Sequence, residues 1–113
     1  MHEATWSALT DPTRRAVLEV LRIHPRAVGD LVDALRITQS ATSKHLRVLR
    51  EAGLVRVLPD RQRRIYAIDP ARFLELDEWL APYRALWNDR LDALGEQLDN
   101  EILAKSDQEL EEQ

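Results

Sequence analysis

The feature that most constrains this chain is a three-residue link, residues 36–38, between two segments with helical patterning. Apolar side chains recur at helical spacing on both sides of it, at Val28, Leu31, Val32 and Leu35 before the link and at Thr42, Leu46 and Leu49 after it. Thr38 can cap the second helix and Gly53 can end it. A link this short forces two helices to cross steeply, which predicts a helix-turn-helix.

Clear start and stop signals frame another helix ahead of this motif, in LTDPTRRAVLEVLRIHP. Asp11 can cap the first turn, Pro12 suits the first helical position, and Pro25 ends the run. The apolar side of this helix is predicted to hold Val17, Val20, Leu21 and His24. Arg14 and Arg15 lie near the helix start, where positive charge is unfavourable, so they hint at an external phosphate.

Two β-prone runs follow the helix-turn-helix, at residues 54–58 and 64–68. They flank a polar turn that contains Pro59 and Asp60, which indicates a hairpin. Helix, helix, short turn, helix and two-stranded ribbon, in that order, predict a winged helix-turn-helix. We therefore expect a mostly α fold with a small β-hairpin.

A long helical pattern begins at Asp69-Pro70, and Pro82 is expected to kink or break it. With 113 residues and no linker or repeat, the chain is predicted to form one domain. Within it we expect a DNA-binding core at 10–68, a C-terminal dimerisation helix region at 70–103 and a frayed acidic tail at 104–113.

The charge of the chain is segregated along the sequence, although the formal net charge is only −4. Residues 1–35 hold 4 basic and 5 acidic side chains, residues 36–64 hold 8 basic and 2 acidic, and residues 65–113 hold 4 basic and 13 acidic. A compact basic block between acidic ends suggests a surface that faces a polyanion. A solvated helix face plus a charged turn is the alternative explanation.

Side chains suited to reading DNA lie on the third helix, opposite its buried residues. These are Gln39, Ser40, Ser43, Lys44 and Arg47. The tip of the hairpin adds Arg61, Gln62, Arg63 and Arg64, which can reach phosphates or the minor groove. His45 lies at the border of the buried face, where it either bonds a phosphate or packs against the hairpin.

An apolar stripe runs along the C-terminal helix, with members at Trp79, Tyr83, Trp87, Leu91, Leu94 and Leu98. It suits either a ligand pocket or, more often for a helical aromatic stripe, packing. The stripe is too long for so small a domain to cover by itself. We therefore expect this helix to pair with its copy in a homodimer, together with an N-terminal helix that contributes Trp6 and Leu9.

Several classes of protein fit the composition poorly. The chain has no cysteine, and its three histidines are scattered, so we expect no metal site and no cofactor. We find no nucleophile–base pair and no phosphate-binding glycine loop, which argues against an enzyme. No apolar run reaches the length of a membrane span, and MHEATW does not resemble a signal peptide. We expect a cytoplasmic protein without a membrane partner.

The stretches DPTRRAVL and SKHLRVLREAGLV, within residues 5–100, resemble the ArsR family of winged-helix bacterial repressors. The continuation LDEWLAPYRALWNDRLDALGEQLD is similar to members that lack the family's metal ligands. The resemblance implies a homodimer that binds operator DNA and represses transcription, often of its own operon. By motif position it implies a DNA-binding role for Gln39, Ser40, Ser43, Lys44 and His45.

Two positions depart from the family pattern. Arg36 stands where a glycine is common, which predicts either a residue at positive φ or another turn geometry. Ala27 stands where a capping Ser or Thr is usual, so the helix that follows has a weaker start.

Together with what the resemblance implies, these patterns predict a sequence-specific, autoregulatory repressor that binds a palindromic operator in double-stranded DNA as a homodimer. A non-specific architectural DNA-binding protein and a protein-interaction module on the same scaffold remain as alternatives. The sequence identifies no effector.

Overall fold

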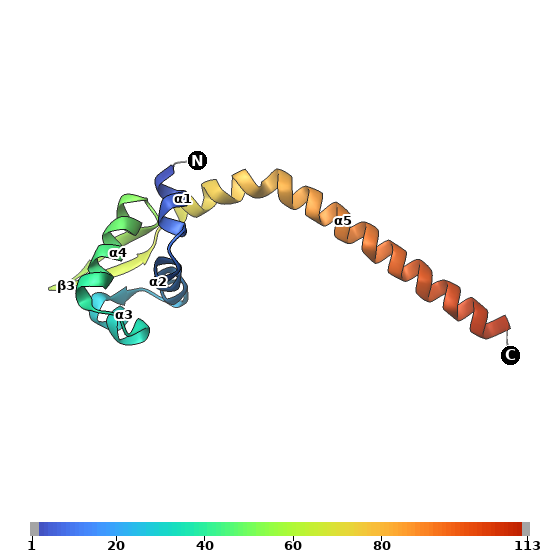
Figure 1. Cartoon of the computed structure of the whole chain (residues 1–113), viewed down its shortest axis with the longest axis horizontal. Helices are drawn as coiled ribbons and strands as arrows, with labels where there is room; N and C mark the ends of the chain where they lie inside the picture. Colours follow the sequence, from blue (N-terminus) through green and yellow to red (C-terminus); the bar gives the residue numbers. More distant parts are fainter. Residues whose placement is uncertain (1–2, 112–113) are drawn as a thin grey trace. The chain divides into compact units, whose positions relative to one another are not determined.

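The computed structural model describes residues 3–111, with side chains described as far as residue 106. Figure 1 labels the elements, which are α1 (Glu3–Leu9), α2 (Pro12–Ile23), β1 (Arg26–Ala27), α3 (Val28–Leu35), α4 (Gln39–Glu51), β2 (Val55–Asp60), β3 (Arg63–Ile68) and α5 (Pro70–Glu111). The chain divides into two compact units, Met1–Asp77 and Glu78–Gln113. The predicted mostly α fold with a small hairpin is confirmed.

Helix α2 begins at its predicted cap, where Asp11 Oδ1 accepts two backbone N–H groups at 2.8 and 3.1 Å. Val17 and Leu21 are buried as predicted. The prediction for His24 was wrong, because this side chain is exposed. The helix ends at Ile23, and His24 has an extended backbone (φ −165°, ψ 160°) that turns it away from the helical face.

The two arginines at the start of α2 donate hydrogen bonds to the last carbonyls of α1. Arg14 Nε donates to the carbonyl of Ala8 at 2.8 Å, and its Nη2 donates to the carbonyl of Ser7 at 3.0 Å. Arg15 Nη1 donates to the carbonyl of Leu9 at 2.8 Å. These carbonyls have no partner within a helix that ends here, and a cation is favourable beside them. The chain itself therefore explains both positive charges, without an external phosphate.

The link between α3 and α4 has the positive φ considered for Arg36. This residue lies in the left-handed region (φ 55°, ψ 41°), and its N–H donates to the carbonyl of Val32 at 2.8 Å. A non-glycine residue in this conformation costs about 1 kcal/mol. The start of α3 lacks a side-chain cap at Ala27, and Asp30 Oδ2 accepts the Ala27 N–H at 3.4 Å instead.

The hairpin is longer than the sequence suggested. Asp60 pairs with Arg63, so Arg61 and Gln62 form the turn, and Arg61 has a φ of 57°. The predicted turn at Pro59 and Asp60 was wrong, because both belong to β2. A proline is tolerated there, since β2 is an edge strand in the order β1-β3-β2.

A third strand, β1, was missed by the sequence patterns. Arg26 pairs with Tyr66 and Ala27 pairs with Ile65, both antiparallel. The sequence patterns predict Ala27 as the cap of the following helix, which begins at Val28, and predict no strand at these two residues. The added strand ties the region before α3 to the hairpin.

The core of the first unit is formed by all four short helices and the base of the hairpin. Its fully buried large side chains are Leu31, Leu46, Leu49, Leu54, Val17, Thr5 and Thr42. Gly53 ends α4 with a φ of 78°, as its predicted role requires. This core holds α4 and the hairpin in fixed positions with respect to each other.

The second unit consists of α5 from residue 78 onward. The helix continues through Pro82, so of the two predicted effects, a kink or a break, the break does not occur. It also continues through most of the acidic tail to Glu111, while residues 112–113 lie outside the described part. No side chain described between residues 78 and 106 is buried. In the described part of the chain, no helix is both long and apolar enough to cross a membrane.

Candidate nucleic-acid interface

The rotation of α4 about its axis is fixed by its buried side. Thr42, Leu46 and Leu49 are exposed by 0%, 1% and 0%, and the Thr42 hydroxyl donates to the carbonyl of Thr38 at 2.8 Å. Thr38 in turn caps the helix, because its Oγ1 accepts the N–H of Ala41 at 3.0 Å. The exposed side therefore carries Ser40, Ser43, Lys44, Arg47 and Arg50.

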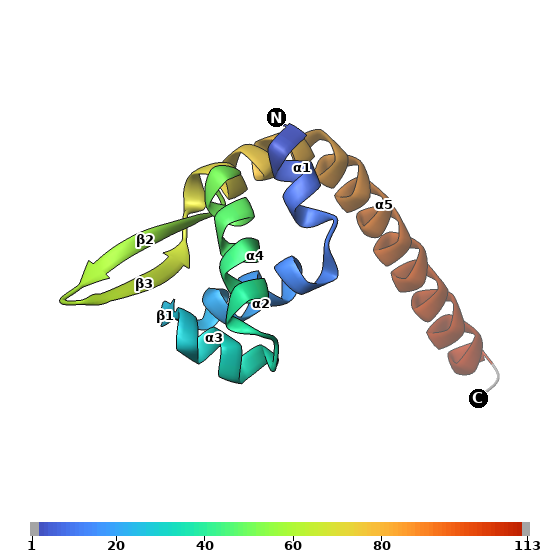
Figure 2. The same cartoon turned by 60° about the vertical axis from the view of Figure 1, so that its left-hand side comes forward.

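A groove of about 470 Å³ lies between α4 and β3, and Figure 2 shows the hairpin projecting from the C-terminal end of this helix. The groove is lined by Ser40, Ser43, Lys44, Leu46, Arg47, Arg50, Arg64 and Tyr66. Leu46 and Tyr66 are buried, which gives the groove an apolar floor. Four cations and two hydroxyls surround that floor, and no carboxylate is part of the lining. The groove can accept an anionic chain.

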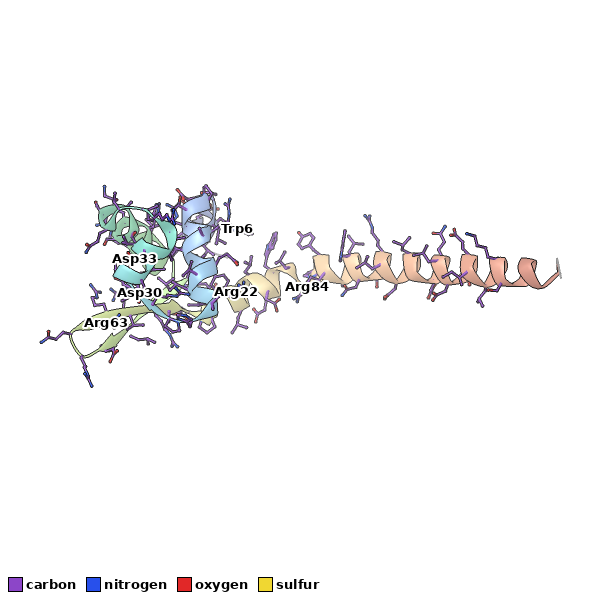
Figure 3. The ribbon with its side chains drawn as sticks, turned by 90° about the horizontal axis from the view of Figure 1, so that it is seen from below. Trp6, Arg22, Asp30, Asp33, Arg63 and Arg84 are labelled. Atoms are coloured by element: carbon purple, nitrogen blue, oxygen red, sulfur yellow. The ribbon has the colours of Figure 1, made fainter. Side chains whose placement is uncertain are left out.

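The hairpin formed by β2 and β3 is the wing of this fold. The alternation of side chains along β3 explains which arginine of the wing faces the groove. Arg64 and Tyr66 are two residues apart in β3 and share a face of the sheet. Arg63 points to the other face, where its Nη2 lies 3.7 Å from Asp30 Oδ2; Figure 3 labels both residues. Both partners are more than half exposed, so this ion pair contributes little. Arg61 and Arg63 line a second hollow at the wing tip.

The positive charge of this surface is not neutralised within the described part of the chain. The ion pairs in the described part of the chain are Arg14–Asp11, Arg22–Glu19, Arg63–Asp30 and Arg72–Glu75. None of them involves Lys44, Arg47, Arg50, Arg61 or Arg64. Of the predicted basic contacts, only Arg63 has a carboxylate partner among the described residues, and that ion pair is weak.

Besides Arg61 and Arg63 at the hairpin tip, two predicted DNA-binding residues of α4 lie outside the groove lining. Gln39 is exposed at the first position of α4. His45 is half-buried and lies toward the cap of α2, where its charge helps to lower the pKa of Asp11. The largest contribution to that lower pKa is the hydrogen bond from the Arg14 N–H, followed among the lowering effects by the Thr13 N–H and the Arg14 charge.

Arg50 joins the groove although the sequence analysis did not select it. It follows Ser43 and Arg47 at helical spacing, seven and three residues further on, so the same periodicity that selected them could have found it. Its place in the last turn of α4 also suits the helix dipole, which is why a purely local role is an alternative.

The residues predicted to form a dimer interface differ in their surroundings. Trp6 is 38% exposed and Trp87 is 62% exposed, whereas Leu9 is half-buried and packs against the core of the first unit. Tyr83, Leu91, Leu94 and Leu98 are about half exposed, and Trp79 packs its ring 5.1 Å from that of Tyr83. Among the described side chains, no three His, Asp or Glu residues form a possible metal-ion site.

A helix-turn-helix with a basic recognition helix, flanked by a basic two-stranded wing, defines a winged helix-turn-helix DNA-binding protein. Residues 11–57 match the model of the bacterial regulatory proteins of the arsR family. The chain is 37% identical over 99 residues to the HTH-type transcriptional regulator Rv2034 of Mycobacterium tuberculosis, in an alignment that spans 88% of this chain and 90% of the relative. This chain belongs to the arsR family of transcriptional regulators.

Solved structures agree with this assignment. An ArsR-like transcriptional regulator from Rhodococcus sp. RHA1 superposes with a TM-score of 0.66 at 27% identity, covering 80% of this chain and 86% of that chain. The homodimeric winged helix-turn-helix DNA-binding domain of Mb0332 from Mycobacterium bovis superposes with a TM-score of 0.59 at 28% identity, covering 70% and 76%.

Proposed function

We propose that this regulator is a repressor that binds a palindromic operator upstream of its own gene as a homodimer. The observation that carries the proposal is the groove between α4 and β3, whose rim holds Lys44, Arg47, Arg50 and Arg64 without a carboxylate. The chain as a whole has a net charge of −4, so this concentration of cations marks the surface for DNA.

The two parts of this surface have different tasks. The N-terminal half of α4 enters the major groove, where Gln39, Ser40 and Ser43 contact base edges. Lys44 and the groove arginines bind the phosphates beside them, and the wing tip reaches the adjacent minor groove. His45 lies toward α2 and does not line the groove. We assign it a secondary contact with the DNA backbone.

The homodimer is supported by the exposed apolar side chains of α5 and by the solved relative described as homodimeric. Two copies related by a two-fold axis present two recognition helices about 34 Å apart, one turn of DNA, which matches two halves of a palindrome.

Fluorescence anisotropy with a duplex from the region upstream of the gene tests the proposal, with a scrambled duplex as control. A specific regulator binds its operator at least about 10³-fold more tightly than the scrambled duplex at physiological salt. Equal affinity for both would identify a non-specific binder, and no binding at low salt would identify a protein-interaction module.

Variants separate the two tasks. Lys44→Ala and Arg64→Ala are expected to weaken binding to both duplexes and to flatten the salt dependence. Gln39→Ala and Ser43→Ala are expected to reduce the preference for the operator and to leave the affinity for the scrambled duplex unchanged. Equal losses in both groups on both duplexes would contradict this division of tasks.

A further inference from the structure

A small pocket of the first unit lies apart from the groove between α4 and β3. It has a volume of about 240 Å³ and is lined by Leu18, Glu19, Arg22, Ile68 and Phe73. These residues come from three elements, α2, β3 and α5, and all of them belong to the first unit. None of them lines the groove proposed for DNA. The pocket therefore needs an explanation of its own.

The inside of this pocket is apolar. Leu18 is buried, and Ile68 and Phe73 are half-buried and pack against the core of the first unit. Nearly all of the surface that lines the pocket is carbon. At about 30 Å³ for each water, the pocket has room for roughly eight waters, which find few hydrogen-bond partners among such walls. An apolar group of similar size, such as a benzyl group, suits this space better than water does.

Two opposite charges lie at the mouth of the pocket. The side chains of Arg22 and Glu19 are 68% and 69% exposed, so their carbon stems line the pocket while their charged ends remain in solvent. Arg22 Nη2 lies 3.1 Å from Glu19 Oε2, and Figure 3 labels Arg22 in the last turn of α2. An exposed ion pair of this kind contributes little to stability, so both partners can exchange it for contacts with a ligand.

From these observations we infer that the pocket binds a free aromatic α-amino acid of the size of phenylalanine. Its benzyl group fills the apolar space beside Phe73, its carboxylate pairs with Arg22, and its ammonium group pairs with Glu19. Both charges of such a ligand are attached to one carbon atom, which matches two protein charges only 3.1 Å apart. An aromatic acid or an aromatic amine fits less well, because each brings a like charge beside one of the two side chains.

The position of the pocket gives the bound amino acid an effector role. Ile68 is the last residue of β3, the strand whose Arg64 lines the groove for DNA. Phe73 belongs to the first turn of α5, and its neighbour Arg72 packs against Gly53 at the end of α4. A ligand beside Phe73 therefore contacts the same turn that packs against the recognition helix. This effector role rests on the proposed function, whereas the binding of the amino acid does not.

Three related compounds test the site on the full chain without DNA. L-phenylalanine carries both charges, 3-phenylpropionate lacks the amine, and 2-phenylethylamine lacks the carboxylate. NMR chemical shifts of the isotope-labelled protein give each Kd, and we expect them to change at the backbone amides of Leu18, Ile68 and Phe73. Each analogue should bind about two- to fivefold more weakly than phenylalanine, as expected for the loss of an exposed ion pair. Glycine, which lacks the benzyl group, should bind at least about tenfold more weakly.

Two substitutions at the mouth of the pocket separate the two charges of the ligand. Arg22→Gln should weaken the binding of phenylalanine and of 3-phenylpropionate but not that of 2-phenylethylamine. Glu19→Gln should weaken the binding of phenylalanine and of 2-phenylethylamine but not that of 3-phenylpropionate. Both side chains are more than two-thirds exposed, so neither substitution is expected to disturb the fold. Each variant therefore serves as the control for the other.

The binding measurements decide between distinct outcomes. Equal losses for all three compounds in both variants, or tighter binding of an analogue than of phenylalanine, would overturn the pairing with Arg22 and Glu19. Glycine that binds as tightly as phenylalanine, chemical shift changes confined to other parts of the chain, or no change at millimolar phenylalanine would overturn the site itself. None of these results bears on the proposed function, because no DNA is present.

The effector role is tested with the operator duplex. Saturating phenylalanine should change the Kd for the operator by about fivefold or more, the usual size of the coupling between two sites on one protein. Glycine at the same concentration is the control and should leave the Kd unchanged. If phenylalanine binds the pocket and the operator Kd does not change, the effector role is wrong. A chain that prefers no operator either with or without phenylalanine contradicts the proposed function instead.

Discussion

The two units of this chain differ in how far they bury their apolar side chains. In the first unit, Leu31, Leu46, Leu49 and Leu54 are no more than 1% exposed. In the second unit, Leu91, Leu94 and Leu98 are 48%, 51% and 49% exposed. Both regions are rich in leucine, so composition does not explain the difference. The first unit has helices and a sheet that cover one another, whereas the second is a single helix in which no described side chain is buried.

This contrast shows that the two units depend on different kinds of packing. The first unit is stabilised within the chain, and its stability positions α4 and the wing. The apolar side of the second unit gains burial only by association. The second unit is therefore expected to control assembly and the first unit the binding of DNA.

The largest expected effect comes from truncating the core of the first unit. Leu31→Ala should lower the free energy of unfolding by about 2–5 kcal/mol, because a fully buried leucine leaves a cavity. Urea unfolding followed by circular dichroism measures it. The matched change Leu98→Ala, in a sample dilute enough to be monomeric, should change the free energy of unfolding by less than about 0.5 kcal/mol. Similar losses for both variants would remove the contrast between the units.

Next in size is the loss of assembly when the stripe is interrupted. Leu94→Asp should weaken the dimer by about 2 kcal/mol or more, roughly 30-fold in Kd, because it buries a carboxylate in an apolar interface. Analytical ultracentrifugation gives the Kd. Leu103→Asp is the control, since Leu103 is 63% exposed and lies on the other side of the helix from the stripe. Equal losses for the two variants would show that the stripe is not the interface.

A smaller effect is expected at the groove. Arg47→Ala should make the slope of log K against log salt shallower by about 1.8 in the dimer, because each of the two copies stops neutralising one phosphate and each phosphate accounts for about 0.9 of the slope. Anisotropy titrations at several salt concentrations measure this slope. Arg22→Ala serves as the control, because Arg22 lies on α2, where it pairs with Glu19 at 3.1 Å. An unchanged slope for Arg47→Ala would exclude this residue from phosphate binding.

The smallest effect concerns acid stability at the cap of α2. The pKa of Asp11 lies below its ordinary value of 3.8, chiefly because the Arg14 N–H donates to the carboxylate. Its ionised form therefore contributes stability above pH 3.8, and this contribution is lost as the pH falls through the lower pKa of the folded state. Asp11→Asn keeps a capping side chain but cannot ionise.

We therefore expect the stability difference between the wild type and Asp11→Asn to shrink as the pH falls below 3.8. Thermal unfolding between neutral and acidic pH measures this difference. A gap that stays constant over the whole range would show that the Asp11 carboxylate does not contribute through its charge.

Much of the first unit follows from local patterns. Thr38 caps α4, Asp11 caps α2 and Gly53 ends α4, because each role depends on a few neighbouring backbone groups. The positive φ at Arg36 is likewise one of the two turn geometries predicted from its place at a position where the family commonly has a glycine. Such features are encoded within about one helical turn, where sequence spacing and spatial distance are nearly the same.

The candidate site was predictable only in part. Helical periodicity brought Ser40, Ser43, Lys44 and Arg47 to one face, and the groove confirms that they lie together. Periodicity did not show that Arg64 faces this groove while Arg63 turns toward Asp30, because that depends on the register of the strands. Their role in DNA binding stays a prediction.

The sequence by itself determined where the main helices of the first unit begin and end, and where positive charge gathers along the chain. Only the tertiary structure decided what distant segments do for each other. It paired Arg26–Ala27 with β3, placed Asp60 in a strand instead of a turn, and directed Arg14 and Arg15 to the carbonyls of α1. The physical reason is that capping and periodicity act between near neighbours, whereas strand pairing and cross-element hydrogen bonds depend on which groups the packed core brings within reach.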